Sequence, residues 1–233
     1  MNKSNQLLCA HSAWVVIIFM GLGIFGVAGW FPPVSPGMVG DELAKMFAED
    51  RMRIRIGMSI LALCAVFWWT FSASIAMQMK RIEGDRAPIL SWVQMASASG
   101  TVMIILLAAY FWLVAAYRVE TKPEMIQMLS DFAWITFIGF YPPGFIQNVS
   151  IGWCILTDKS GKRVYPRWVG FANIWLAILF LPGALLPFFT GGPFSWNGII
   201  GFWLVANAFF GWIIMMWWMT VKAIKQQALD EGE

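Results

Sequence analysis

The sequence has almost none of the side chains that bind metals or transfer protons inside a membrane. Its single histidine, His11, precedes the first long apolar segment. Ligation of haem, copper or iron by histidines, and acid–base catalysis by histidine within the membrane, therefore lack their residues. Retinal would need a lysine in the middle of a span, and the last apolar segment has only Lys222, at its end. We expect neither a metal nor a cofactor.

Charge is scarce as well. Charged residues make up 12% of the chain, whereas 59% of its residues are hydrophobic and 16% are aromatic. This composition lies outside the range of soluble domains and is typical of proteins that cross a membrane several times. The net charge of +3 is small and no basic stripe is interleaved with polar residues, so we expect no nucleic-acid partner. The three cysteines form an odd set, which predicts free thiols.

Six apolar segments are long enough to cross a bilayer as helices. The sequence therefore predicts an all-α polytopic membrane protein with six transmembrane helices in a single domain, residues 1–233. Residues 168–221 contain no charged residue and no histidine, so the boundary between the last two spans depends on Pro187 and the turn at residues 191–193. The expected spans are residues 13–30, 56–78, 88–116, 132–157, 168–187 and 197–221.

The basic residues predict how the chain is oriented. Six spans place both termini on one side of the membrane, and with the termini inside, ten of the sixteen Lys and Arg residues lie in cytoplasmic segments. The positive-inside rule therefore places both termini in the cytoplasm. An amphipathic helix at about residues 41–53 is expected at the outer interface. It would be either a solvated connector or a lid over an outer opening.

The fourth span is interrupted near its middle by Tyr141, Pro142, Pro143 and Gly144. Two adjacent prolines remove two backbone donors and clash with carbonyls one turn earlier, so the helix is expected to break or kink at Pro142-Pro143. Polar backbone freed at that depth is tolerated only where protein or a cavity covers it. The interruption is therefore either a structural kink or the wall of an apolar pocket.

Uncharged polar side chains are the remaining candidates for a site. Most of them fall in one layer, roughly 8 to 15 Å below the cytoplasmic surface by helical rise, and Asn207 lies deeper. Amides are costly in lipid unless paired, so they should either join helices or line a cavity that opens toward the cytoplasmic half. With aromatic walls, such a cavity suits a lipid, a sterol-like compound or a pigment. The candidate ligand-binding residues are Gln94, Ser97, Tyr141, Gln147, Asn148, Asn173 and Asn207.

Four short segments carry a resemblance to known proteins: FPPVSP at residues 31–36, DRMRIRIGM at 50–58, PRWVG at 166–170 and GPFSWNG at 192–198. Through them the chain resembles a group of bacterial inner-membrane proteins that have no assigned function. The likeness covers nearly the whole chain. It implies a six-helix protein of the bacterial inner membrane and transfers no functional residue.

Three functions fit these observations. The first is the binding or movement of a neutral hydrophobic small molecule or lipid within the bilayer, without catalysis. The second is a packing or accessory subunit, in a homo-oligomer or a larger membrane complex, which the long uncharged tract also favours. The third is a membrane enzyme that acts on lipid through Asp131, Asp158 or interfacial arginines. The sequence leaves catalysis open but favours a non-enzymatic protein, with membrane lipids as expected partners.

Overall fold

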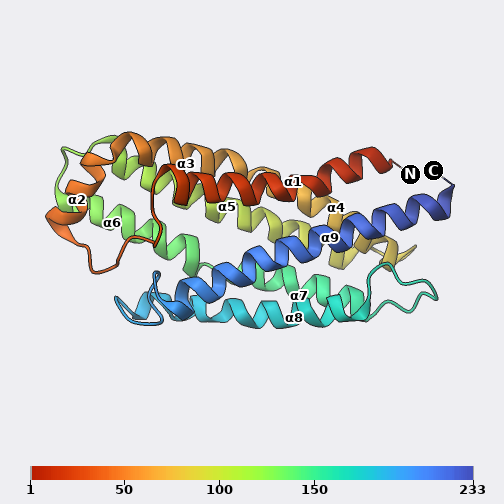
Figure 1. Ribbon diagram of the computed structural model, residues 1–233. Helices are drawn as coiled ribbons and strands as arrows, with labels where there is room; N and C mark the ends of the chain where they lie inside the picture. Colours follow the sequence, from red (N-terminus) through yellow and green to blue (C-terminus); the bar gives the residue numbers. More distant parts are fainter. Residues whose placement is uncertain (1, 233) are drawn as a thin grey trace.

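The computed structural model describes residues 2–232, and these residues form an all-α fold without strands. The helices run lengthwise in an elongated bundle, and both termini lie at the same end of it (Figure 1). Within the described chain, five helices are long and apolar enough to cross a membrane. They are Lys3–Val27, Arg51–Glu83, Ile89–Tyr117, Arg167–Phe188 and Ile199–Glu231. The chain therefore has the construction of a multi-pass helical membrane protein.

The N-terminal helix α1 (Lys3–Gly21) continues into a π-helical segment, η1 (Leu22–Val27). The chain then leads to α2 (Gly40–Glu49), a short helix at the end of the bundle opposite the termini (Figure 1). Leu43 and Phe47 of α2 are buried, while the acids of its first turn are exposed. The helix expected at about residues 41–53 thus ends earlier, because the backbone turns at Asp50 and a new helix begins.

The next long helix consists of α3 (Arg51–Ala65) and α4 (Phe67–Glu83), which are separated by Val66. After a short turn, α5 (Ile89–Tyr117) runs back along the bundle. The carboxylate of Glu83 accepts hydrogen bonds from the backbone N–H groups of Leu90 and Ser91, at 2.9 and 3.2 Å, and from the Ser91 hydroxyl. These are donors that the first turn of α5 would otherwise leave unpaired. Glu83 therefore fixes the start of α5.

The segment expected to be the fourth span consists of two separate helical parts. α6 (Pro123–Trp134) continues into a π-helical segment, η2 (Ile135–Gly139), and α7 (Pro142–Leu156) follows after two non-helical residues. Pro142 and Pro143 occupy the first turn of α7. Proline is tolerated there because the N–H groups of the first turn have no acceptor within the helix. The 12 and 5 residues of α6 and η2, and the 15 of α7, are each too few for a spanning helix, so this segment is not among the five.

The C-terminal part begins with α8 (Arg167–Phe180) and a 3₁₀ segment, η3 (Leu181–Phe188). It ends with a π-helical segment, η4 (Ile199–Leu204), and α9 (Val205–Glu231), which returns to the end where the termini lie (Figure 1). α8 packs closely on α7, because Gly152 faces the backbone of Gly170: a β-carbon on Gly152 would stand 2.9 Å from that carbonyl oxygen.

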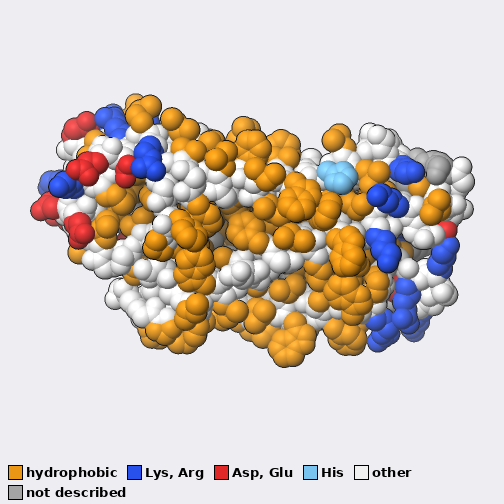
Figure 2. Space-filling view, viewed as in Figure 1, with side chains coloured by type: hydrophobic (Ala, Val, Ile, Leu, Met, Phe, Trp, Pro, Cys, Tyr) orange, Lys and Arg blue, Asp and Glu red, His pale blue; other side chains and the backbone are white. Residues whose placement is uncertain are grey.

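Hydrophobic and charged side chains occupy different parts of the surface. In Figure 2, hydrophobic side chains cover the middle of the visible face and charged side chains gather at its two ends. The basic residues gather at the end where the termini lie, whereas acids and bases are mixed at the opposite end. Large aromatic side chains are exposed along the bundle, among them Trp92 at 71% and Trp175 at 65%. Apolar groups exposed in this way need an apolar solvent around the bundle.

Candidate functional site

An apolar cavity of about 120 Å³ lies where the helical segment between α6 and α7 is interrupted. Phe140, Tyr141 and Gly144 of the interruption line one wall. The other walls come from α1 and η1, the middle of α5, η2, the end of α8, and η4 with the start of α9. Elements from the whole length of the chain therefore meet at this cavity.

All three π-helical segments of the described chain reach the cavity. η1 contributes Ile24 and Phe25, η2 contributes Phe137 and Ile138, and η4 contributes Phe202. A π-helical turn places one more residue in the turn than an α-helix does, and such turns are frequent at functional sites. The three π-helical segments thus meet at one cavity, together with the two non-helical residues between η2 and α7.

The lining is almost entirely hydrocarbon. Eight of its seventeen residues are aromatic and none is charged. The hydroxyl-bearing side chains are those of Thr101 and Tyr141. Thr101 donates to the carbonyl of Ser97 at 3.4 Å, whereas the hydroxyl of Tyr141 has no partner among residues 2–232. The arrangement can bind a largely apolar molecule.

The cavity is partly open rather than sealed. Phe140, one of its lining residues, is 55% exposed, while Ile105 and Phe202 in its walls are buried. The lining residues of α5 lie at the middle of that helix, between the two charged ends of the bundle. The cavity therefore lies at the level of the bundle where the visible surface is hydrophobic.

Tyr141 is the one predicted ligand-binding residue that lines the cavity. Ser97 lies one turn before Thr101 in α5, and Asn148 lies one turn after Gly144 in α7. Each is joined to a lining residue: the Ser97 carbonyl accepts from Thr101, and the Asn148 amide donates to the Gly144 carbonyl at 2.9 Å. These two residues support the wall without forming it.

The remaining predicted residues lie elsewhere in the bundle. The Gln147 amide donates to the Ser72 hydroxyl at 3.3 Å and joins α7 to α4. Asn173 accepts from the indole N–H of Trp212 at 2.8 Å and joins α8 to α9. Asn207 is exposed and donates to the carbonyl of Trp203 at 2.7 Å, within its own helical segment.

Gln94 is fully buried, and neither atom of its amide has a hydrogen-bond partner. The side-chain oxygen of Asn148 is also buried without a partner. Some of the predicted polar residues thus join helices by hydrogen bonds, and others are buried with an atom that has no partner. Of the predicted set, Tyr141 alone lines the cavity.

Asp131 and Asp158, the acids at the two ends of the predicted fourth span, lie away from the cavity. Asp158 is 5% exposed and organises the loop between α7 and α8. Its carboxylate accepts from the N–H and hydroxyl of Ser160, at 2.9 and 2.6 Å, and from the N–H of Val164 at 3.3 Å. Neither Asp158 nor Asp131 lines the cavity. Within residues 2–232, no group of three His, Cys, Asp or Glu side chains could hold a metal ion.

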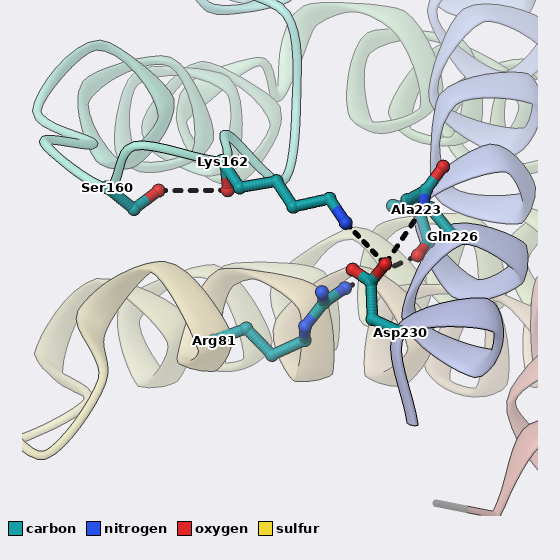
Figure 3. Close-up of polar contacts among 6 residues, drawn as sticks. All are labelled: Arg81, Ser160, Lys162, Ala223, Gln226 and Asp230. Atoms are coloured by element: carbon teal, nitrogen blue, oxygen red, sulfur yellow. Dashed lines mark hydrogen bonds and ion pairs between the residues drawn. The ribbon is translucent and has the colours of Figure 1, made fainter. Parts of the chain in front are cut away.

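Charged side chains at the terminal end of the bundle tie its outermost turns together (Figure 3). Lys162, in the loop before α8, forms an ion pair with Asp230 near the end of α9, and Gln226 donates to the same carboxylate at 3.0 Å. These hydrogen bonds lower the pKa of Asp230. Arg81 of α4 donates to the carbonyl of Ala223 at 3.3 Å. The end of α9, beyond its apolar part, is thus held by both neighbours.

Most of the cavity lining could not be anticipated from the sequence. Phe137, Phe202 and Phe209 occur in long apolar runs, where nothing in their spacing distinguishes them from lipid-facing residues. The sequence feature that pointed to this place was Pro142-Pro143, which begins α7 directly after the non-helical residues Phe140 and Tyr141. Comparison of the chain with family models, curated proteins and solved structures finds no match. The resemblance to bacterial inner-membrane proteins therefore stays a prediction.

Proposed function

We propose that the protein binds a neutral hydrophobic small molecule or lipid inside the bilayer, in the cavity at the interruption between α6 and α7, as a carrier or binding protein without catalytic activity. The observation that carries this proposal is the convergence of three π-helical segments and the interruption on one partly open cavity with an uncharged lining. Concave, largely apolar sites with a few polar groups are the usual form of small-molecule sites.

The membrane arrangement is part of the proposal. We take α6, η2 and α7 together as a broken fourth crossing, which brings the five spanning helices to six and agrees with the two termini lying at one end (Figure 1). The basic residues at that end support a cytoplasmic location for it by the positive-inside rule, and we propose that the membrane is the inner membrane of a bacterial cell. The cavity residues then lie between the middle and the outer end of five of the six predicted spans. A molecule that reaches them comes from the hydrocarbon layer.

The alternative functions gain no specific support from the side chains. A lipid-acting enzyme would need reactive groups near its substrate, and Asp158 is already engaged by its own loop. An accessory subunit remains compatible with the exposed apolar surface, but that surface is equally what lipid requires. Binding in the cavity is the function that the geometry favours.

Native mass spectrometry of the protein purified in mild detergent tests this proposal. Ala206→Phe adds a ring to the cavity wall, whereas Gly211→Phe adds the same ring on the exposed side of α9, where a β-carbon meets nothing within 4 Å. After incubation with a bacterial lipid extract, wild type and Gly211→Phe should retain a nonpolar molecule that Ala206→Phe has lost. The proposal is overturned if wild type retains none, or if all three proteins retain the same species.

A further inference from the structure

The size of the cavity limits what part of a molecule it can hold. Its volume of about 120 Å³ is close to that of engineered apolar cavities of about 150 Å³, which bind benzene. A single six-membered ring or a short piece of chain fits, and a fused ring system does not. Because the cavity is partly open and lies at the level where the bundle surface is hydrophobic, the rest of a larger molecule can remain in the lipid.

The walls favour a ring over a chain. Eight of the seventeen lining residues are aromatic, against 16% aromatic residues in the whole sequence. Aromatic side chains pack against a planar ring in offset or edge-to-face geometry, with attraction beyond that of the buried area alone. An alkyl chain gains less from such walls and loses more rotational freedom when it is held.

Tyr141 carries one of the two side-chain hydroxyls among the residues that line the cavity. The N–H of Tyr141 bonds to the carbonyl of Gly139 at 2.9 Å, but its hydroxyl has no partner in the part of the chain that the structure describes. The other hydroxyl in the lining, on Thr101, already donates to its own helix. A polar group in hydrocarbon is stabilised by any partner it can bond, so an oxygen on a bound ring would be held at Tyr141.

We propose that the cavity selects a neutral planar ring that carries an oxygen, of the phenol or quinone type, with an apolar tail that stays in the bilayer. Tyr141 is the residue that distinguishes such a ring from a plain hydrocarbon. This inference rests on the proposed function, because it names the class of molecule that the same cavity takes.

Three probes with the same number of carbons separate these features: para-hexylphenol, hexylbenzene and dodecan-1-ol. Each is titrated by calorimetry into the protein in lipid nanodiscs, with empty nanodiscs as the correction for partitioning. Wild type should bind para-hexylphenol roughly three- to tenfold more tightly than hexylbenzene, the range that one hydrogen bond supplies. Dodecan-1-ol should bind most weakly. Tyr141→Phe should remove the preference for the phenol and leave hexylbenzene unchanged.

Two further variants separate failure of this inference from failure of the proposed function. If wild type binds all three probes equally and Ala206→Phe abolishes binding while Gly211→Phe does not, the cavity binds hydrophobic molecules but does not select an oxygen-bearing ring. If binding of every probe is the same in wild type and Ala206→Phe, both proposals fall. A preference for the phenol that survives in Tyr141→Phe overturns the role of Tyr141. Thermal unfolding of Tyr141→Phe confirms that the variant is folded.

Discussion

Gly100 of α5 lies directly against the ring of Pro143 in the first turn of α7. A β-carbon on Gly100 would stand 2.9 Å from both Cβ and Cγ of the proline. Contacts this short require a shift of the neighbour, and protein interiors have little room for one. Thr101 and Gly144, the next residues along these two helices, line the cavity, so the Gly100–Pro143 contact lies directly beside it.

Gly100→Ala should destabilise the protein by about 1–3 kcal/mol, the usual cost of forcing extra volume into a packed contact. The loss should be smaller when the change is made in a Pro143→Gly background, because glycine lacks both ring carbons, Cβ and Cγ, that the added β-carbon would meet. Unfolding in detergent, followed for the two single variants and the double variant, measures this coupling. Equal effects of Gly100→Ala in both backgrounds would show that the ring is not the obstacle.

Gly23 and Gly21 form a matched pair at the end of α1. A β-carbon on Gly23 would lie 2.6 Å from the carbonyl oxygen of Gly57 in α3, whereas one on Gly21 meets nothing within 4 Å. Gly23→Ala should therefore lower the unfolding temperature, because two backbones must separate. Gly21→Ala should leave it unchanged or raise it, since the residue is in helical conformation and alanine favours helix by up to about 1 kcal/mol. Similar effects from both would contradict the close approach of η1 to α3.

Asn173 and Asn207 differ in a way that stability measurements can detect. Each amide donates to the carbonyl four residues earlier, but Asn173 also accepts from Trp212 on another helix. Asn173→Leu should cost about 1–2 kcal/mol, because it leaves a buried indole N–H unpaired. Asn207→Leu, on an exposed position, should cost nothing measurable. If the two variants unfold alike, the bond between α8 and α9 does not stabilise the bundle.

The ion pair between Lys162 and Asp230 predicts a dependence on pH. The pKa of Asp230 is lowered in the folded protein, first by its hydrogen bond from Lys162 and then by that from Gln226. Its contribution is therefore fully present above the ordinary aspartate pKa of about 3.9 and is lost as the pH falls through the lowered value. The stability difference between wild type and Asp230→Asn should be constant from neutral pH to about 4 and shrink below it. A difference that grows on acidification would contradict the pair.

The sequence predicts the fold class because length and apolarity are local properties that the bilayer requires. It also indicates the interruption, since Pro142 and Pro143 act on the backbone wherever they stand. It does not indicate that the prolines begin a helix, or that η1, η2 and η4 are π-helical, because those outcomes depend on the packing of distant segments. Residues of all three π-helical segments line the cavity. Among the residues that line the cavity, Tyr141 could therefore be predicted from the sequence, whereas the phenylalanines around it could not.

A cluster of tryptophans near α2 makes the same point. Trp30, Trp112 and Trp134 are buried together, with ring centroids 4.8 to 5.6 Å apart, although they are far apart in the sequence. Their indole N–H groups have no hydrogen-bond partners. The rings instead contact one another, and Trp112 meets both of its neighbours edge to face. Each tryptophan alone looks like an interface residue. Only the fold reveals a shared core.

The central claim is that the cavity at the interruption holds a nonpolar molecule in the membrane. A density map of the protein in nanodiscs of bacterial lipid, at a resolution that resolves side chains, tests it most directly. We predict continuous density that belongs to no side chain, bounded by Tyr141, Phe202 and Phe209, in wild type but not in Ala206→Phe. A wild-type map in which the walls have closed together, with no such density, would contradict the account.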